Sequence, residues 1–135
     1  MIGIDSNILL RAIANDDTMQ SPLARDFLSS LSASGPGVVN SVVLAEVSWA
    51  LRKRYKEPLS TVLAVVSQLL ESDAYVIPDR DAVIRAVEAC RNSGLEFADA
   101  LIGELNLIAG ARSTATFDGQ ASKAPAFERL SIGKH

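Results

Sequence analysis

The chain has 135 residues, of which 48% are hydrophobic, and this is enough for one compact domain but too little for two. Its net charge of −3 excludes a cationic protein that coats nucleic acid, although an enzyme that cuts nucleic acid with metal ions stays open. Cys90 is the only cysteine, which excludes an intramolecular disulfide and a cysteine-based metal site. We expect one domain over residues 1–135, in the cytoplasm and without a membrane segment.

Short apolar segments alternate along the chain with longer segments of helical periodicity, and proline, glycine and capping residues separate them. The expected strands cover residues 2–4, 38–39, 74–77, 113–116 and 127–132. The expected helices cover residues 6–13, 21–32, 41 to before Pro58, 60 onward, 79 to about 93, and 97–109. Ser21, Ser60 and Asp79 are the expected caps of three of these helices.

Each connection between consecutive strands, up to the fourth strand, contains at least one expected helix. Parallel strands require such crossovers, and the helices then cover the faces of the sheet. The sequence therefore predicts an α/β fold, a three-layer α/β/α sandwich with a short, mainly parallel central sheet. Ligands of such folds bind at the carboxyl ends of the strands.

Acidic residues gather at the places where this fold would bind a ligand. Asp5 ends the first strand, and Asp118 comes two residues after the fourth strand. Glu46 lies in the helix that follows the second strand, while Glu96 and Asp99 lie at the start of the helix that precedes the fourth. Since parallel strands share one direction, we expect these carboxylates to converge at one edge of the sheet.

A cluster of carboxylates resists ionisation unless a positive charge lies among them. Mg²⁺ and Mn²⁺ prefer carboxylate and water oxygens, and such an ion lowers the pKa of its water and stabilises charge on a phosphodiester. His135, the only histidine, is the last residue and is not expected to be catalytic. The pattern therefore favours metal-dependent hydrolysis over catalysis by a serine, histidine or cysteine.

Several of these residues also have a purely structural interpretation. Asp5 is suited to cap the helix that begins at Ser6, and Asp118 is suited to an Asx turn before Gly119. The basic run Arg52–Arg54 suits the C-terminus of a helix.

Arg11 lies in the short helix after Asp5 and is a candidate contact to the substrate. Cys90 belongs to an apolar helical face and is expected to lie in the core.

Four segments together resemble the motifs of PIN-domain proteins, in order and at ordinary spacing. They are Met1-Ile-Gly-Ile-Asp5-Ser-Asn7, Val43-Leu-Ala-Glu46-Val, Glu96-Phe-Ala-Asp99-Ala-Leu-Ile102 and Thr116-Phe-Asp118. The chain length and motif style resemble the VapC toxins of prokaryotic toxin–antitoxin pairs. Two departures are Glu96, where the family usually has Asp, and Gly119-Gln120, which replace a more frequent basic residue.

The resemblance implies an endoribonuclease toxin that hydrolyses RNA phosphodiester bonds through a metal-activated water. Asp5, Glu46, Asp99 and Asp118 match the catalytic acids, and Asp5, Asp99 and Asp118 would hold Mg²⁺ or Mn²⁺. Asn7, Glu96 and Thr116 would support these acids. Independently of the resemblance, the position of Arg11 in the helix after Asp5 makes it the candidate that would contact the RNA. The resemblance further implies a homodimer inhibited by a VapB-like antitoxin, which we expect to cover apolar residues such as Leu9, Leu10 and Leu28.

Two other functions remain open from the sequence. The first is a PIN scaffold that binds RNA or protein without catalysis, although such proteins usually lose acids that this chain keeps. The second is an aspartyl-phosphate phosphotransferase with Asp5 as the nucleophile. That enzyme type usually needs a second aspartate two positions later, where this chain has Asn7.

Overall fold

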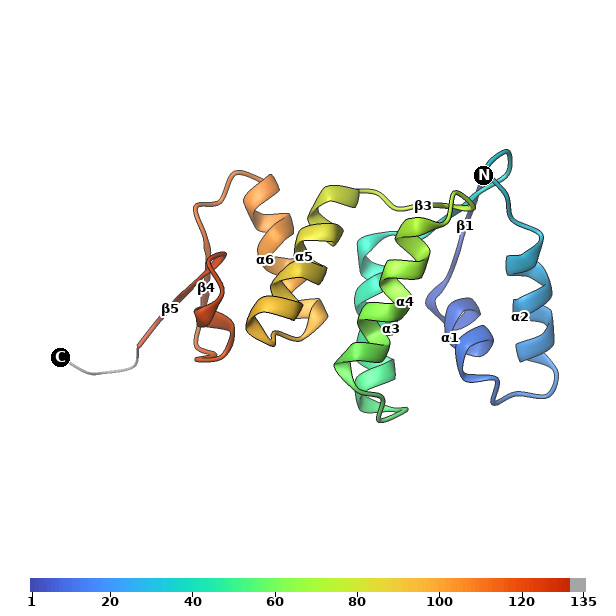
Figure 1. Ribbon diagram of the computed structural model, residues 1–135, viewed down its shortest axis with the longest axis horizontal. Coiled ribbons are helices and arrows are strands. Elements are labelled where there is room, and N and C mark those ends of the chain that lie inside the picture. Colours follow the sequence, from blue (N-terminus) through green and yellow to red (C-terminus); the bar gives the residue numbers. More distant parts are fainter. Residues whose placement is uncertain (132–135) are drawn as a thin grey trace. The chain divides into compact units, whose positions relative to one another are not determined.

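The computed structural model describes residues 1–131 and forms two compact units, the first ending at Pro78 and the second beginning at Asp79 (Figure 1). Ile132, where the last strand was expected to end, and His135 lie outside the described residues. None of the helices within residues 1–131 is both long enough and apolar enough to cross a membrane. Each unit has its own strands and helices.

The first unit alternates three two-residue strands with four helices. Its strands are β1 (Ile2–Gly3), β2 (Gly37–Val38) and β3 (Tyr75–Val76). Its helices are α1 (Ser6–Ala14), α2 (Gln20–Ser29), α3 (Ser41–Lys53) and α4 (Leu59–Glu71). The strands pair in parallel in the order β1-β2-β3, with Ile2 opposite Gly37 and Gly37 opposite Tyr75. The residues that follow these strands therefore lie at one edge of the sheet.

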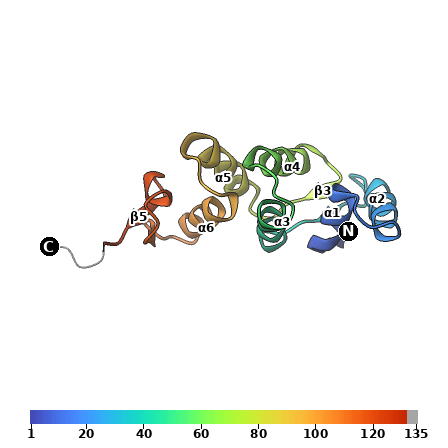
Figure 2. The ribbon, with the colours of Figure 1, turned by 90° about the horizontal axis from the view of Figure 1, so that it is seen from below.

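The core of the first unit forms where its helices meet. Helix α1 packs against α2 and α3, and α3 packs against α4 (Figures 1 and 2). Leu9 and Leu10 of α1, Val47 of α3 and Val66 of α4 are all buried there. The expectation that a partner covers Leu9 and Leu10 is therefore wrong, because the apolar face of α1 is already used inside the unit.

The second unit pairs two helices and adds two strands. Its elements are α5 (Arg80–Ser93), α6 (Phe97–Ile108), β4 (Thr114–Thr116), the 3₁₀ helix η1 (Ala121–Lys123) and β5 (Phe127–Arg129). Helix α5 packs along α6, and β4 pairs in parallel with β5. Cys90 of α5 is buried as predicted, and this burial raises the pKa of its thiol to about 12.

The structure confirms an α/β fold with short parallel strands, and it differs from the prediction in three details. Its strands pair in two sheets, one in each unit, rather than in a single continuous sheet. Helix α2 begins at Gln20, one residue before Ser21, because the Asp17 carboxylate accepts hydrogen bonds from the backbone N–H groups of Met19 and Gln20. Helix α4 begins at Leu59 with Pro58 at the cap position, so Ser60 is not its cap.

Gly103 lets helix α6 approach β5 closely. A Cβ atom at Gly103 would lie 2.7 Å from Cε2 and 2.9 Å from Cζ of Phe127. We therefore expect Gly103→Ala to destabilise the protein, since overpacking costs about 1–3 kcal/mol and alanine recovers at most about 1 kcal/mol of helix propensity. Thermal unfolding measures the effect. Gly35→Ala is the control, because nothing lies within 4 Å of its Cβ position; equal melting temperatures for both variants would contradict the close packing.

Candidate active site

Two of the four predicted catalytic acids lie in the first unit. Asp5 comes two residues after β1 and is the N-cap of α1, where its Oδ1 accepts a hydrogen bond of 2.9 Å from the backbone N–H of Ser6. The capping interpretation of Asp5 is thus confirmed, and the carboxylate is exposed. Glu46 is exposed on α3, a helix that packs against α1, and Asn7 is exposed in the first turn of α1.

Asn40 occupies the position after β2 that Asp5 occupies after β1. It is the N-cap of α3, and its side-chain oxygen accepts a hydrogen bond of 3.0 Å from the backbone N–H of Val43. The two caps therefore follow neighbouring parallel strands, at the edge where α/β folds bind ligands. Sequence reasoning placed the start of this helix at Ser41 and did not consider Asn40, although asparagine before a helical segment is a strong capping signal.

The other two acids lie together in the second unit. Asp99 is in the first turn of α6, and Asp118 follows β4. Both line a hollow of about 220 Å³, together with Ile102, Thr114, Ala115, Thr116, Ala121 and Phe127. Burial raises the pKa of Asp99, and the nearby carboxylates of Asp118 and Glu96 raise that pKa further. The structure therefore places Asp99 and Asp118 in one hollow, with the charge of Glu96 also acting on Asp99.

Hydrogen bonds within the motif fix the backbone around Asp118. The Thr116 hydroxyl accepts a hydrogen bond of 3.0 Å from the backbone N–H of Asp118. Asp118 Oδ1 in turn accepts one of 2.8 Å from the backbone N–H of Gln120, which is the Asx turn that the sequence suggested. The turn orients the Asp118 carboxylate.

Gln120 connects this turn to the end of α5. Its side-chain Nε2 donates a hydrogen bond of 2.8 Å to the backbone carbonyl of Ser93, just before Gly94 and the segment that leads to Asp99. This hydrogen bond therefore joins the segment just after the fourth motif to the segment just before the third. Sequence reasoning missed this role of Gln120, because nothing local pairs it with a residue 27 positions earlier.

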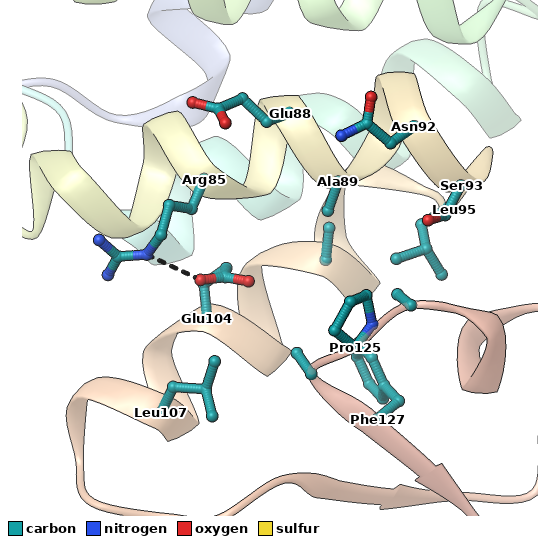
Figure 3. Close-up of a pocket in the computed structure, with 13 residues that line it drawn as sticks. Arg85, Glu88, Ala89, Asn92, Ser93, Leu95, Glu104, Leu107, Pro125 and Phe127 are labelled. Atoms are coloured by element: carbon teal, nitrogen blue, oxygen red, sulfur yellow. Dashed lines mark hydrogen bonds and ion pairs between the residues drawn. The ribbon is translucent and has the colours of Figure 1, made fainter.

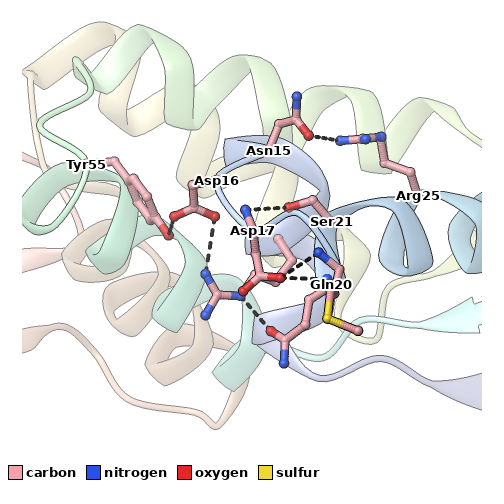
Figure 4. Close-up of polar contacts among 9 residues, drawn as sticks. Asn15, Asp16, Asp17, Gln20, Ser21, Arg25 and Tyr55 are labelled. Atoms are coloured by element: carbon pink, nitrogen blue, oxygen red, sulfur yellow. Dashed lines mark hydrogen bonds and ion pairs between the residues drawn. The ribbon is translucent and has the colours of Figure 1, made fainter.

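Asp16, Gln20 and Tyr55 belong to a polar network at the loop between α1 and α2 (Figure 4). Arg11 of α1 joins this network. Its Nη1 donates to Asp16 Oδ1 at 3.2 Å, and its Nε donates to Gln20 Oε1 at 2.8 Å. The Tyr55 hydroxyl donates to the other Asp16 oxygen at 3.0 Å. The bond from Tyr55, and then the one from Arg11, lowers the pKa of Asp16. The network therefore holds the Arg11 guanidinium in one orientation while leaving it partly exposed.

A larger hollow of about 370 Å³ lies between α5, α6 and the segment leading into β5 (Figure 3). Its polar wall includes an ion pair of 2.9 Å between Arg85 Nε and the mostly buried Glu104. None of the residues that line this hollow belongs to the predicted catalytic set. Because Arg85 already neutralises Glu104, the buried carboxylate of this hollow is not free for chemistry.

The donor set around Asp99 fits a hard divalent cation in chemical type. Carboxylate oxygens are the ligands that Mg²⁺ and Mn²⁺ prefer, and a cation would relieve the repulsion among Asp99, Asp118 and Glu96. Among residues 1–131, no three acidic, histidine or cysteine side chains lie closely enough together to hold a metal ion. The structure thus supplies a pair of carboxylates in the second unit, while Asp5 and Glu46 belong to the first.

Comparison with known proteins identifies the family. Residues 2–126 match the family model of the PIN domain, and this match covers the first unit almost completely and extends into the second. A search of curated proteins gives no significant match. PIN domains are generally nucleases that bind nucleic acid. This agrees with the positions of Asp5 and Asp118, which follow the parallel strands β1 and β4. Because the match covers nearly the whole chain, this protein belongs to the PIN domain family.

Proposed function

We propose that this PIN domain is a metal-dependent endoribonuclease and the toxin of a type II toxin–antitoxin pair. The observation that carries the nuclease activity is the Asp99–Asp118 pair, in a hollow beside the end of β4. We propose that residues 1–135 act as one domain, in which Asp5 and Glu46 work with Asp99 and Asp118. The family match supports this, since it continues across the boundary between the units.

In this proposal Asp5, Asp99 and Asp118 would hold Mg²⁺ or Mn²⁺, and Glu46 would share the ion or orient the attacking water. A bound ion of this kind lowers the pKa of water and neutralises negative charge on the phosphodiester. Hydrolysis then leaves a 5′-phosphate and a 3′-hydroxyl.

In this proposal, neighbouring residues position the catalytic carboxylates and bind the RNA. Thr116 fixes the backbone of Asp118 through its hydroxyl, while Glu96 adds negative charge beside Asp99. Asn7 supports Asp5 from the first turn of α1. Arg11, oriented by Asp16 and Gln20, contacts a phosphate of the RNA.

The proposed partners follow from the toxin role. A VapB-like antitoxin would inhibit the enzyme by placing an Arg or Lys side chain among the carboxylates, where it forms charge-assisted hydrogen bonds. The toxin would act as a homodimer in the cytoplasm.

Metal-dependent RNA cleavage is the direct test. We expect the purified chain to cut single-stranded RNA in millimolar Mg²⁺ or Mn²⁺, and to lose this activity completely in EDTA. A metal ion at about ten times its Kd should also stabilise the fold by about 1.4 kcal/mol, because it binds only the native state. Product ends are identified by labelling, and unfolding is measured with and without the ion.

Three outcomes would contradict parts of this proposal. Tight RNA binding without metal-dependent cleavage would indicate a binding module instead of an enzyme. A trapped phosphoenzyme would indicate a phosphotransferase. RNA cleavage without growth arrest on expression, and without a short neighbouring gene whose product restores growth, would retain the nuclease and reject the toxin role.

A further inference from the structure

Arg129 at the end of β5 lies beside the turn that carries Asp118. In the parallel pair of β4 and β5, Arg129 is opposite Thr116 and Phe127 is opposite Thr114. Side chains two residues apart on a strand point to the same face of the sheet, so Arg129 shares its face with Phe127. Phe127 lines the hollow of Asp99 and Asp118. The side chain of Arg129 therefore leaves β5 on the face of the sheet where the hollow of Asp99 and Asp118 lies.

The guanidinium group of Arg129 lies against Gly119, the residue directly after Asp118. A Cβ atom at Gly119 would be 3.0 Å from Nη1 and 3.3 Å from Cζ of Arg129. The absence of a side chain at Gly119 therefore lets the cation approach the backbone of the acidic turn. This position places a positive charge next to the candidate site although no basic residue directly follows Asp118 in the sequence.

The donors of Arg129 are available, in contrast to those of two other arginines in the second unit. Arg85 is paired with Glu104 at 2.9 Å, and Arg112 is paired with Glu128 at 3.0 Å. Within residues 1–131, the structure gives the exposed Arg129 side chain neither an ion pair nor a hydrogen bond. Asp118 meanwhile directs one oxygen to the backbone of Gln120. An unpaired guanidinium beside the turn that carries Asp118 is suited to a ligand that brings its own negative charge.

We propose that Arg129 binds a backbone phosphate of the RNA next to the Asp99–Asp118 pair. This inference rests on the proposed nuclease function and adds a residue that determines how RNA is held. The protein carries a net charge of −3, so RNA approaching the carboxylates is repelled unless a cation compensates. A guanidinium can donate two parallel hydrogen bonds to one phosphate, which fixes both its position and its orientation.

The test compares the Arg129→Gln variant with an Arg112→Gln variant. Arg112 follows α6 and is already paired with Glu128. We expect Arg129→Gln to raise KM for single-stranded RNA by about tenfold or more, with kcat changed far less, because a charge-assisted hydrogen bond to the substrate is lost. The slope of log(kcat/KM) against log[salt] should become shallower by about 0.7, the value for one phosphate contact on a single strand. Arg112→Gln should change neither quantity, and Arg129→Lys should recover part of the loss.

The outcomes separate this inference from the proposed function. If the unaltered protein cleaves RNA and Arg129→Gln keeps its KM and salt slope, the role of Arg129 is overturned while the nuclease stands. If the unaltered protein does not cleave RNA, the function fails, and fluorescence anisotropy with labelled RNA still tests whether Arg129 binds phosphate. A lower melting temperature in both Arg129→Gln and Arg129→Lys, with unchanged KM, would assign Arg129 to stability and overturn the inference.

Discussion

Replacing Asp99 with Asn is expected to reduce RNA cleavage by more than about 100-fold, since even residues that only orient metal ligands contribute about 10–100-fold. Asn has nearly the same shape as Asp but carries no charge, so the α6 helix and the hollow should remain. The loss should appear together in metal affinity, measured by calorimetry, and in the cleavage rate. Asp81→Asn is the matched control, because Asp81 is an acid in the first turn of α5 just as Asp99 is in α6.

The same variant should make the metal-free protein more stable at neutral pH. Burial and the carboxylates of Asp118 and Glu96 raise the pKa of Asp99 above its ordinary value of 3.8, so the native state holds this proton more tightly than the unfolded state does. The stability that Asp99 contributes is therefore fully present below pH 3.8 and is lost as the pH rises through the raised value. The amide of the Asp99→Asn variant cannot ionise, so that loss should be absent.

Unfolding curves in EDTA, from acidic to neutral pH, measure this difference. The melting temperatures of the two proteins should diverge as the pH rises, with the variant higher at about pH 7. A variant that cleaves RNA at the normal rate would remove Asp99 from the catalytic set. A variant that becomes less stable at neutral pH than the unaltered protein would show that the Asp99 carboxylate is compensated in the native state.

Asp5→Asn is expected to reduce cleavage by a similar factor, above about 100-fold, without loss of stability. The amide oxygen of Asn can accept the same hydrogen bond from Ser6 that the carboxylate accepts at 2.9 Å, and Asn is as good an N-cap as Asp. If the role of Asp5 is purely structural, the Asp5→Asn substitution should change neither folding nor RNA cleavage. If Asp5 is catalytic, the substitution should leave folding unchanged and reduce cleavage.

Two further variants calibrate the Asp5 result. Asp79→Asn changes another aspartate at an N-cap position, that of α5, and should cleave RNA normally. Asp5→Ala removes the cap as well as the charge and should cost about 1 kcal/mol of stability in addition to the loss of cleavage. Normal cleavage by a well-folded Asp5→Asn protein would leave Asp5 as a helix cap and would reject the proposed four-carboxylate site.

Local sequence signals determined most of the helices and the positions of the acids. Apolar residues at helical spacing predicted α1, α5 and α6 nearly to their ends, although α3 ends at Lys53, before the Pro58 that was expected to break it. Gly94 marked the end of α5 because it adopts a left-handed conformation there. The motif around Asp118 was also readable, since an Asx turn depends only on residues two positions apart. These features follow from interactions between neighbours in the chain, which the order of residues contains directly.

Contacts between distant residues were decided only by the tertiary structure. The pairing of β4 with β5, the bond from Gln120 to Ser93 and the position of Arg129 over Gly119 all join segments that no local pattern connects. Leu9 and Leu10 were expected to be covered by a partner, but they are buried inside the unit. The apolar face of α1 to which they belong packs against α2 and α3. The sequence by itself determined which residues are acidic, apolar or helix-forming. Which of them share a hollow, and hence the raised pKa of Asp99, depends on burial and on charges brought close by folding.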